Sequence, residues 1–160
     1  MRPKINNNYI LGACTLVMLA LCLLSIWQPM SHQKEQQLRE EAVKQRLLLI
    51  RQAEERYRQK NGTYAGSFAT LTKGGWLADS LQYVPYAETP TPFSLSASTI
   101  VGKDGKPKPV MECGATYDTY LYGLPAEDIE QANEQANNAG LYPGLKIGDI
   151  TTDNNNAVNW

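Results

Sequence analysis

The apolar residues of this chain form one uninterrupted run near its start and several periodic stretches after it. The run ILGACTLVMLALCLLSIW, residues 10–27, contains no charged residue. At about 1.5 Å per residue, a helix of this length covers roughly 27 Å, close to the ~30 Å hydrocarbon core of a bilayer. The run ends without the small-residue cleavage site of an export signal, and Trp27 suits the headgroup interface. The pattern predicts a retained transmembrane helix over residues 9–28, after a short basic tail over residues 1–8.

A lipoprotein signal is the main competing interpretation of this segment. Leu11-Gly12-Ala13-Cys14 matches a lipobox, in which the cysteine receives the lipid. A lipobox follows its apolar region, whereas here the apolar residues come after Cys14, so we favour the anchor. Lysine and arginine flank the segment on both sides, but long C-terminal domains translocate largely regardless of charge. We therefore expect a single-pass protein with a cytoplasmic N-terminus and its C-terminal domain on the other side of the membrane.

The stretch after the anchor has the 3.6-residue period of an amphipathic helix. The apolar positions that share one face of this helix are Val43, Leu47, Ile50, Ala53 and Tyr57. Pro29 predicts a bend or break between this helix and the anchor. Asn61-Gly62 predicts its end, because glycine is preferred just past a helix C-terminus. Residues 29–62 are thus expected to form an amphipathic stem whose apolar face is buried by the residues that follow.

The remaining residues, 63–160, alternate short apolar runs with turn signals. Helices are expected at 67–75 and 125–140, and strands at 81–86, 92–101, 109–113 and 144–150. Asp-Gly within residues 103–106 is typical of a tight hairpin turn. The predicted fold class is α+β, in which a transmembrane helix continues into a long amphipathic helix packed on a small antiparallel sheet.

Composition and charge limit the range of functions. With 42% hydrophobic and 19% charged residues, the chain has the composition of a folded protein. Residues 1–61 carry ten basic and five acidic side chains, and residues 62–160 carry five and eleven. The basic part is the anchor with its stem. A basic stem beside a membrane can attract anionic lipid headgroups, but we favour a solvated helix face as the explanation of its charges, and the expected contact with the lipid bilayer is through residues 9–28. No basic patch of the kind that binds nucleic acid is present in the sequence.

The sequence contains no recognisable catalytic motif. Its single histidine, His32, lies beside the anchor, and Cys113 is the only cysteine after residue 22. Cys113 therefore has no partner for a disulfide within the head and is expected to be a small buried side chain. No P-loop, G-x-G-x-x-G or G-x-S-x-G motif occurs. We predict no catalytic residues and no organic cofactor, and we expect that the protein is not an enzyme.

The order of these parts resembles the type IV pilins and the pseudopilins of type II secretion. In that family the stem commonly ends with a tyrosine followed by an NG-x-Y turn, a pattern matched here by Tyr57, Asn61, Gly62 and Tyr64. The chain end GDITTDNNNAVNW is similar to the close of the major pseudopilins. The resemblance implies a structural subunit of a secretion or surface-fibre apparatus in the bacterial cell envelope. It also implies an anchor in the inner membrane, a periplasmic head, and other pilin-like subunits as partners.

The resemblance further implies a calcium site in the C-terminal loop. The residues that could supply the hard oxygen ligands preferred by calcium are Asp149, Asp153 and Asn154. The alternative is a polar, frayed chain end, which is common in proteins. Trp160 favours the ordered alternative, because a frayed tail has little reason to carry a large apolar residue.

A second function is compatible with the same parts. In the best alignment with the family's N-terminal signature, Ala13 stands at the glycine of the cleavage site and Met18 at the glutamate. The chain could therefore be a single-pass, membrane-tethered accessory or binding domain that does not polymerise.

Overall fold

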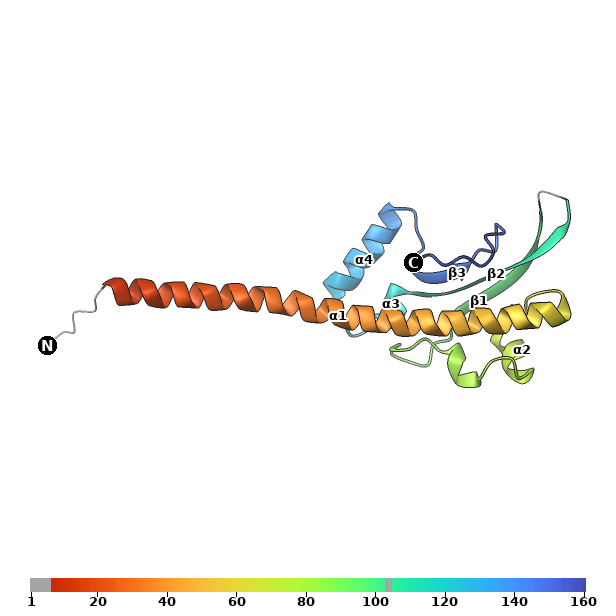
Figure 1. Ribbon diagram of the computed structural model, residues 1–160, viewed down its shortest axis with the longest axis horizontal. Coiled ribbons are helices and arrows are strands. Elements are labelled where there is room, and N and C mark those ends of the chain that lie inside the picture. The colour runs from red at the N-terminus through yellow and green to blue at the C-terminus, as the bar shows by residue number, and fades with distance from the viewer. Residues whose placement is uncertain (1–6, 103–104) are drawn as a thin grey trace. The chain divides into compact units, whose positions relative to one another are not determined.

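The protein is an α+β structure in which a long helix accompanies a three-stranded antiparallel sheet (Figure 1). The computed structural model describes the backbone of residues 7–102 and 105–160, and the side chains of residues 11–22, 33–102 and 105–160. The helical elements are α1 (Asn7–Asn61), α2 (Phe68–Lys73), the 3-10 helix η1 (Asp79–Gln82), α3 (Tyr117–Tyr120) and α4 (Ala126–Asn138). The strands are β1 (Ser94–Val101), β2 (Pro107–Thr116) and β3 (Gly144–Gly148). The predicted fold class is confirmed to this extent.

Helix α1 passes through both of the compact units into which the chain divides, Met1–Gln37 and Leu38–Trp160. The break that the sequence predicts at Pro29 is wrong, because α1 continues through this position. A proline removes one N–H donor, while the residues on either side keep theirs. The predicted end is confirmed, since the N–H of Gly62 donates to Arg58 O at 2.8 Å and closes the last turn.

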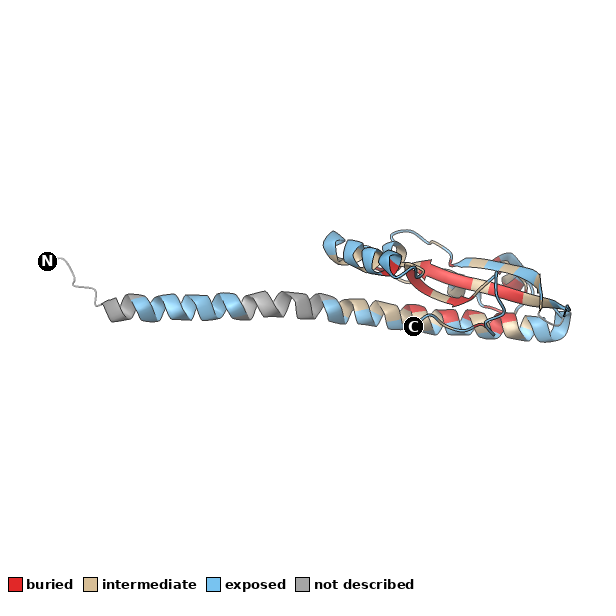
Figure 2. Cartoon of the chain, turned by 90° about the horizontal axis from the view of Figure 1, so that it is seen from above, coloured by how far each residue is buried: buried red, intermediate tan, exposed pale blue. Residues whose placement is uncertain are grey.

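The apolar face predicted for the stem lies in the core of the second unit (Figure 2). Val43, Leu47, Ile50 and Ala53 are fully buried, and the partly buried Tyr57 packs against the same cluster. The sheet contributes inward-facing side chains from β2 and β3, among them the fully buried Met111, Cys113 and Ile147. Both the position of the stem face and the burial of Cys113 are therefore confirmed.

The sheet has the strand order β1-β2-β3, with both neighbouring pairs antiparallel. β1 and β2 form the predicted hairpin, with Val101 opposite Pro107 and Ser94 opposite Gly114. β3 pairs only with the second half of β2, from Glu112 to Thr116. Residues 107–111 of β2 consequently have β1 as their only neighbouring strand among the residues described.

The strand predicted at residues 81–86 is wrong. Its first two residues are the end of η1, and Tyr83 then forms an isolated bridge with Pro92. Leu81 lies within η1 and Val84 lies two residues beyond its end, and both side chains contact the hydrophobic core. The other predicted elements are present, at 68–73, 94–101, 107–116, 126–138 and 144–148. Sequence reasoning missed the short helix α3.

Candidate functional site

The C-terminal loop, residues 149–157, is closed at its base by β3. The N–H of Gly148 donates to Ala157 O at 2.8 Å, and Val158 forms an isolated antiparallel bridge with Ile147. Asn159 secures the same contact, because its Oδ1 accepts the N–H of Lys146 at 2.8 Å and its Nδ2 donates to Gly144 O at 2.9 Å. The interpretation of this segment as a frayed end is therefore wrong. Trp160, in contrast, is 39% exposed. The loop is therefore closed by the hydrogen bonds of Asn159 rather than by burial of Trp160.

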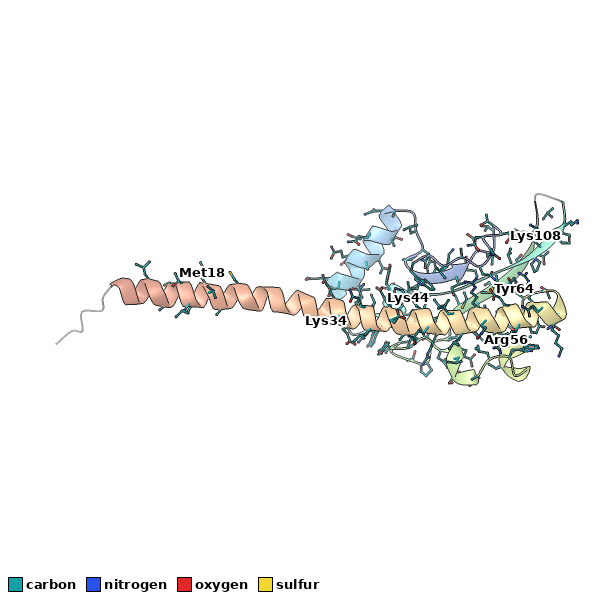
Figure 3. The ribbon with its side chains drawn as sticks, in the orientation of Figure 1. Met18, Lys34, Lys44, Arg56, Tyr64 and Lys108 are labelled. Atoms are coloured by element: carbon teal, nitrogen blue, oxygen red, sulfur yellow. The ribbon has the colours of Figure 1, made fainter. Side chains whose placement is uncertain are left out.

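The two carboxylates predicted to bind calcium already have partners within the protein. Asp149 Oδ1 accepts the N–H of Thr151 at 2.7 Å and its hydroxyl at 2.5 Å. The hydroxyl of Thr151, followed by its N–H, holds the pKa of Asp149 below the ordinary aspartate value. Asp153 Oδ2 lies 3.4 Å from the ammonium of Lys108 on β2 (Figure 3), and its Oδ1 accepts the N–H of Asn155 at 3.3 Å.

Asn154 takes part in the turn through its backbone, and among the described residues its side chain has no hydrogen bond to Asp149 or Asp153. Its N–H donates to Thr152 O at 3.0 Å, and its carbonyl accepts the N–H of Ala157 at 3.2 Å. In the described part of the chain, no group of three or more His, Cys, Asp or Glu side chains is placed to hold a metal. Calcium binding by Asp149, Asp153 and Asn154 stays a prediction.

The loop is also tied to the end of α1 through a buried tyrosine. Asn156, with its side chain buried, donates from Nδ2 to the hydroxyl of Tyr64 at 2.6 Å. The guanidinium of Arg58 donates to the same hydroxyl at 2.7 Å. Asn156 has a φ of 52°, a left-handed conformation that asparagine tolerates better than most residues. Sequence reasoning missed this contact, although the run of three asparagines is a signal for left-handed turns.

A buried glutamate holds the chain where it leaves α1. Glu54 is fully buried, and its two carboxylate oxygens accept the N–H groups of Ala65 at 2.7 Å and of Gly66 at 3.2 Å. Burial raises the pKa of Glu54, and the two backbone hydrogen bonds oppose this shift. Gly66 has a φ of 65° and lies so close to Ala97 that an added Cβ would come within 2.9 Å of that side chain. The only sequence signal for this contact between Glu54 and the backbone of residues 65–66 is the position of the glutamate, four residues after Ile50 on the apolar face of the helix.

Cys113 is unsuited to nucleophilic chemistry in this environment. Its side chain is fully buried, and burial, followed by the negative charges of Glu54 and Glu112, raises the pKa of the thiol. A nucleophilic cysteine requires the opposite, an accessible sulfur with a lowered pKa. The expectation that the protein is not an enzyme stays a prediction.

The first half of α1 presents large apolar side chains to its surroundings. Six of them are between 57% and 72% exposed: Leu11, Leu16, Val17, Met18, Leu19 and Leu21. Met18 is labelled on this part of the helix in Figure 3. The side chains of residues 9–10 and 23–28 of the predicted transmembrane segment lie outside the described residues. Within what is described, no helix is long and apolar enough to cross a membrane.

Comparisons with known proteins do not connect the chain to any family. No protein-family model matches it, and neither a curated protein nor a solved structure is significantly similar to it.

Proposed function

We propose that this protein is a membrane-anchored, pilin-like structural subunit of a secretion or surface-fibre apparatus. The proposal rests on one observation. A single helix, α1, contains a charge-free apolar segment, residues 10–27, followed by a segment whose apolar face packs against a small antiparallel sheet. The first segment would anchor the subunit in the bacterial inner membrane, with the N-terminus cytoplasmic. The second would carry the periplasmic head domain.

The exposed apolar side chains in the first half of α1 support the proposal that this part of the helix lies in an apolar environment. Fully burying a side chain of the size of Leu, Val or Met is worth about 1.5–3 kcal/mol. Six such side chains are largely exposed between residues 11 and 21. Transfer of this surface into lipid, or against the helices of neighbouring subunits, is therefore strongly favourable. Thr15 does not oppose transfer, because its hydroxyl donates to Gly12 O at 2.9 Å within the helix.

The contacts of the Y…NG-x-Y pattern support the pilin-like proposal at the other end of α1. The side chain of Asn61 donates to Tyr57 O at 2.9 Å, which satisfies a carbonyl in the last turn. Gly62 ends the helix, and Tyr64 then turns its hydroxyl to Arg58 and the C-terminal loop. Asn61, Gly62 and Tyr64 thus take part in the turn that leads the chain from α1 to α2, and Tyr57 contributes its backbone carbonyl.

Calcium binding in the C-terminal loop belongs to the same proposal. Asp149, Asp153 and Asn154 lie in one loop, and this loop is closed at its base. Carboxylate and amide oxygens are suitable calcium ligands. Binding would require Asp153 to exchange its contact with Lys108 for the metal. Calcium would then stabilise the loop and, through Asn156, its contact with Tyr64.

The mature N-terminus tests the assembly proposal. Full-length protein, tagged at its C-terminus, would be isolated from bacterial membranes and its intact mass measured. Removal of residues 1–13, with or without methylation of the new N-terminus at Cys14, is the result expected for a processed pilin-like subunit. An intact N-terminus would instead support the membrane-tethered domain that does not polymerise, which the residues Ala13 and Met18 favour.

Membrane insertion is tested separately by extraction with alkaline carbonate. The full-length protein should stay in the membrane pellet. A Leu16→Arg, Leu19→Arg double variant should be released, because arginine at the centre of a transmembrane helix costs about 2.5–3.5 kcal/mol. The double variant Leu16→Ile, Leu19→Ile is the matched control and should behave as the parent. Release of the parent protein by carbonate would refute the anchor.

A further inference from the structure

A basic surface surrounds Trp76 beside the end of α1. Arg56 and Lys60 lie one turn apart on α1, and Lys73 is the last residue of α2. The guanidinium of Arg56 donates from Nη2 to Trp76 O at 3.3 Å, and the ammonium of Lys60 lies 5.4 Å from the centre of the indole ring. All three basic residues are exposed, and none of them pairs with a carboxylate among the described residues. Their positive charges are therefore left without an opposite charge around one aromatic side chain.

Trp76 is held in place at the centre of this surface. Its indole ring makes an edge-to-face contact with Tyr57, with the ring centres 5.8 Å apart. Gly74 allows the ring to lie against the backbone, since an added Cβ would come within 2.6 Å of Trp76 Cδ1. The residue is only partly buried, and its indole N–H has no hydrogen-bond partner among the described residues. Tryptophan and arginine are among the residues that most often dominate the energy of protein interfaces. The basic surface therefore suits a negatively charged protein partner.

The exposed face of α4 carries the opposite charge. Glu127, Glu130 and Glu134 are spaced three and four residues apart, so they share one face of the helix, and all three are exposed. Neither a hydrogen bond nor an ion pair joins their side chains to another described residue. The sequence has no lysine or arginine between Lys108 and Lys146. The helix dipole favours acids in the first turn, which accounts for Glu127 but not for the other two. A row of like charges is thus left without a partner along α4.

The two surfaces lie at opposite ends of the unit Leu38–Trp160. Tyr122, just before α4, accepts a hydrogen bond at its carbonyl from Arg39 Nη1 at 2.7 Å, which places the start of α4 beside the first residues of this unit. Arg56 and Lys60 lie about 26–32 Å further along α1, at about 1.5 Å per residue. Figure 1 shows α4 and α2 at opposite ends of the unit, and Figure 3 shows Arg56 at the end where α2 lies. One copy of the chain therefore cannot bring its own two surfaces together.

We propose that the acidic face of α4 in one copy of this chain binds the basic surface around Trp76 in the next copy. The chain itself carries both members of the pair, three glutamates on one surface and three bases on the other. Their spacing also matches. Glu130 and Glu134 are one helical turn apart, as are Arg56 and Lys60, so the Cβ atoms of each pair are about 5–6 Å apart and two ion pairs can form side by side.

A contact between two different surfaces leaves one of each surface free on the outer copies. Repetition of the contact therefore builds a ring or an open chain of subunits. The inference deepens the proposed function, and it rests on that proposal for the fibre in which the contact would repeat. A contact made by one 13-residue helix is smaller than the roughly 1,200–2,000 Å² of a stable interface. Association of single pairs should thus be weak, and salt should weaken it further.

Reversal of the charges tests the contact. Self-association of the full-length protein in mild detergent would be followed by sedimentation velocity over a range of protein concentrations. The double variants Arg56→Glu, Lys60→Glu and Glu130→Lys, Glu134→Lys each reverse one surface. Each should associate about tenfold or more weakly than the parent, because like charges then meet. The double variant Arg56→Lys, Lys60→Arg keeps both charges, and as the matched control it should associate nearly as the parent does.

A mixture of the two reversed variants separates this contact from a general effect of charge. Every contact between unlike variants in the mixture joins opposite charges, so the mixture should associate as the parent does. A mixture that stays as dissociated as its components would overturn the inference, and so would reversed variants that associate as strongly as the parent. A parent protein that remains monomeric at all concentrations would also overturn it, and would indicate another protein as the partner of the basic surface.

Chemical cross-linking tests which residues meet. A carbodiimide joins a carboxylate directly to an amine without a spacer. In a mixture of unlabelled and isotope-labelled full-length protein, mass spectrometry should find links of mixed isotope composition that join Lys60 or Lys73 to Glu130 or Glu134. Links between copies that involve only other residues would refute the proposed contact.

Failure of this inference is distinguishable from failure of the pilin-like proposal. A processed N-terminus together with association that does not depend on these charges would refute the contact alone. An intact N-terminus together with association that the reversed variants lose and their mixture restores would retain the contact and refute the pilin-like subunit.

Discussion

Replacing Leu47 by alanine should strongly destabilise the packing of α1 on the sheet. Leu47 is fully buried in the core cluster that joins the helix to β2 and β3. The change removes three carbon atoms, which at about 0.8 kcal/mol per buried methylene corresponds to roughly 2.4 kcal/mol. The cavity left behind adds to this, and measured costs for such changes are about 2–5 kcal/mol. The loss is a large share of the ~5–15 kcal/mol that stabilises a small domain.

The matched control for Leu47→Ala is the neighbouring leucine. Leu48 is 45% exposed at the next position of α1, so Leu48→Ala should cost far less. Both changes would be made in a fragment of residues 31–160 and followed by thermal melts monitored by circular dichroism. At about 3–5 °C per kcal/mol for a domain of this size, Leu47→Ala should lower the melting temperature by about 6–25 °C. Equal shifts for the two variants would mean that the buried face of α1 is assigned wrongly.

Three further predictions concern the contacts around the C-terminal loop and the end of α1. Glu54→Gln should destabilise the same fragment by about 1–3 kcal/mol in urea titrations, because one buried N–H loses its acceptor. The raised pKa of Glu54 contributes stability that is complete below the ordinary glutamate pKa and is lost as pH rises through the raised value, so this part of the pH dependence should be absent in the variant. Asn156→Ala should cost about 1–3 kcal/mol, whereas Asn154→Ala, at an exposed position, should be nearly neutral in metal-free buffer. If the loop binds calcium, saturation at a hundred times the dissociation constant should add about 2.7 kcal/mol, and Asp153→Ala should remove this gain; identical melts with calcium and with chelator would contradict the calcium prediction.

Local patterns in the sequence were sufficient to locate most elements. The stem face from Val43 to Tyr57 was predictable because the period of apolar side chains follows from helix geometry alone. The β1–β2 hairpin was predictable from two β-prone runs separated by Asp-Gly. The strand predicted at 81–86 failed because such a short apolar run suits a strand or a 3-10 turn equally well. Whether an adjacent strand exists to pair with it is not a local property.

The contacts that close the head depend on residues far apart in the chain. Glu54 looks like an interruption of an apolar face until the N–H groups of Ala65 and Gly66 meet its carboxylate. Asn156 and Asn159 look like a polar tail until they bond to Tyr64 and to β3. A hydrogen bond is directional and short-ranged, so the sequence can name a donor or an acceptor without naming its partner.

The sequence by itself determined the apolar segment before residue 28, the amphipathic face of α1, and the presence of a small antiparallel sheet after it. These features follow from the composition and period of neighbouring residues, which set which surfaces leave water. Only the tertiary structure decided that the chain end closes on β3 and that Glu54 accepts the N–H groups of Ala65 and Gly66. Both features are contacts between segments that are distant in the chain, and the pattern of neighbouring residues does not specify such contacts.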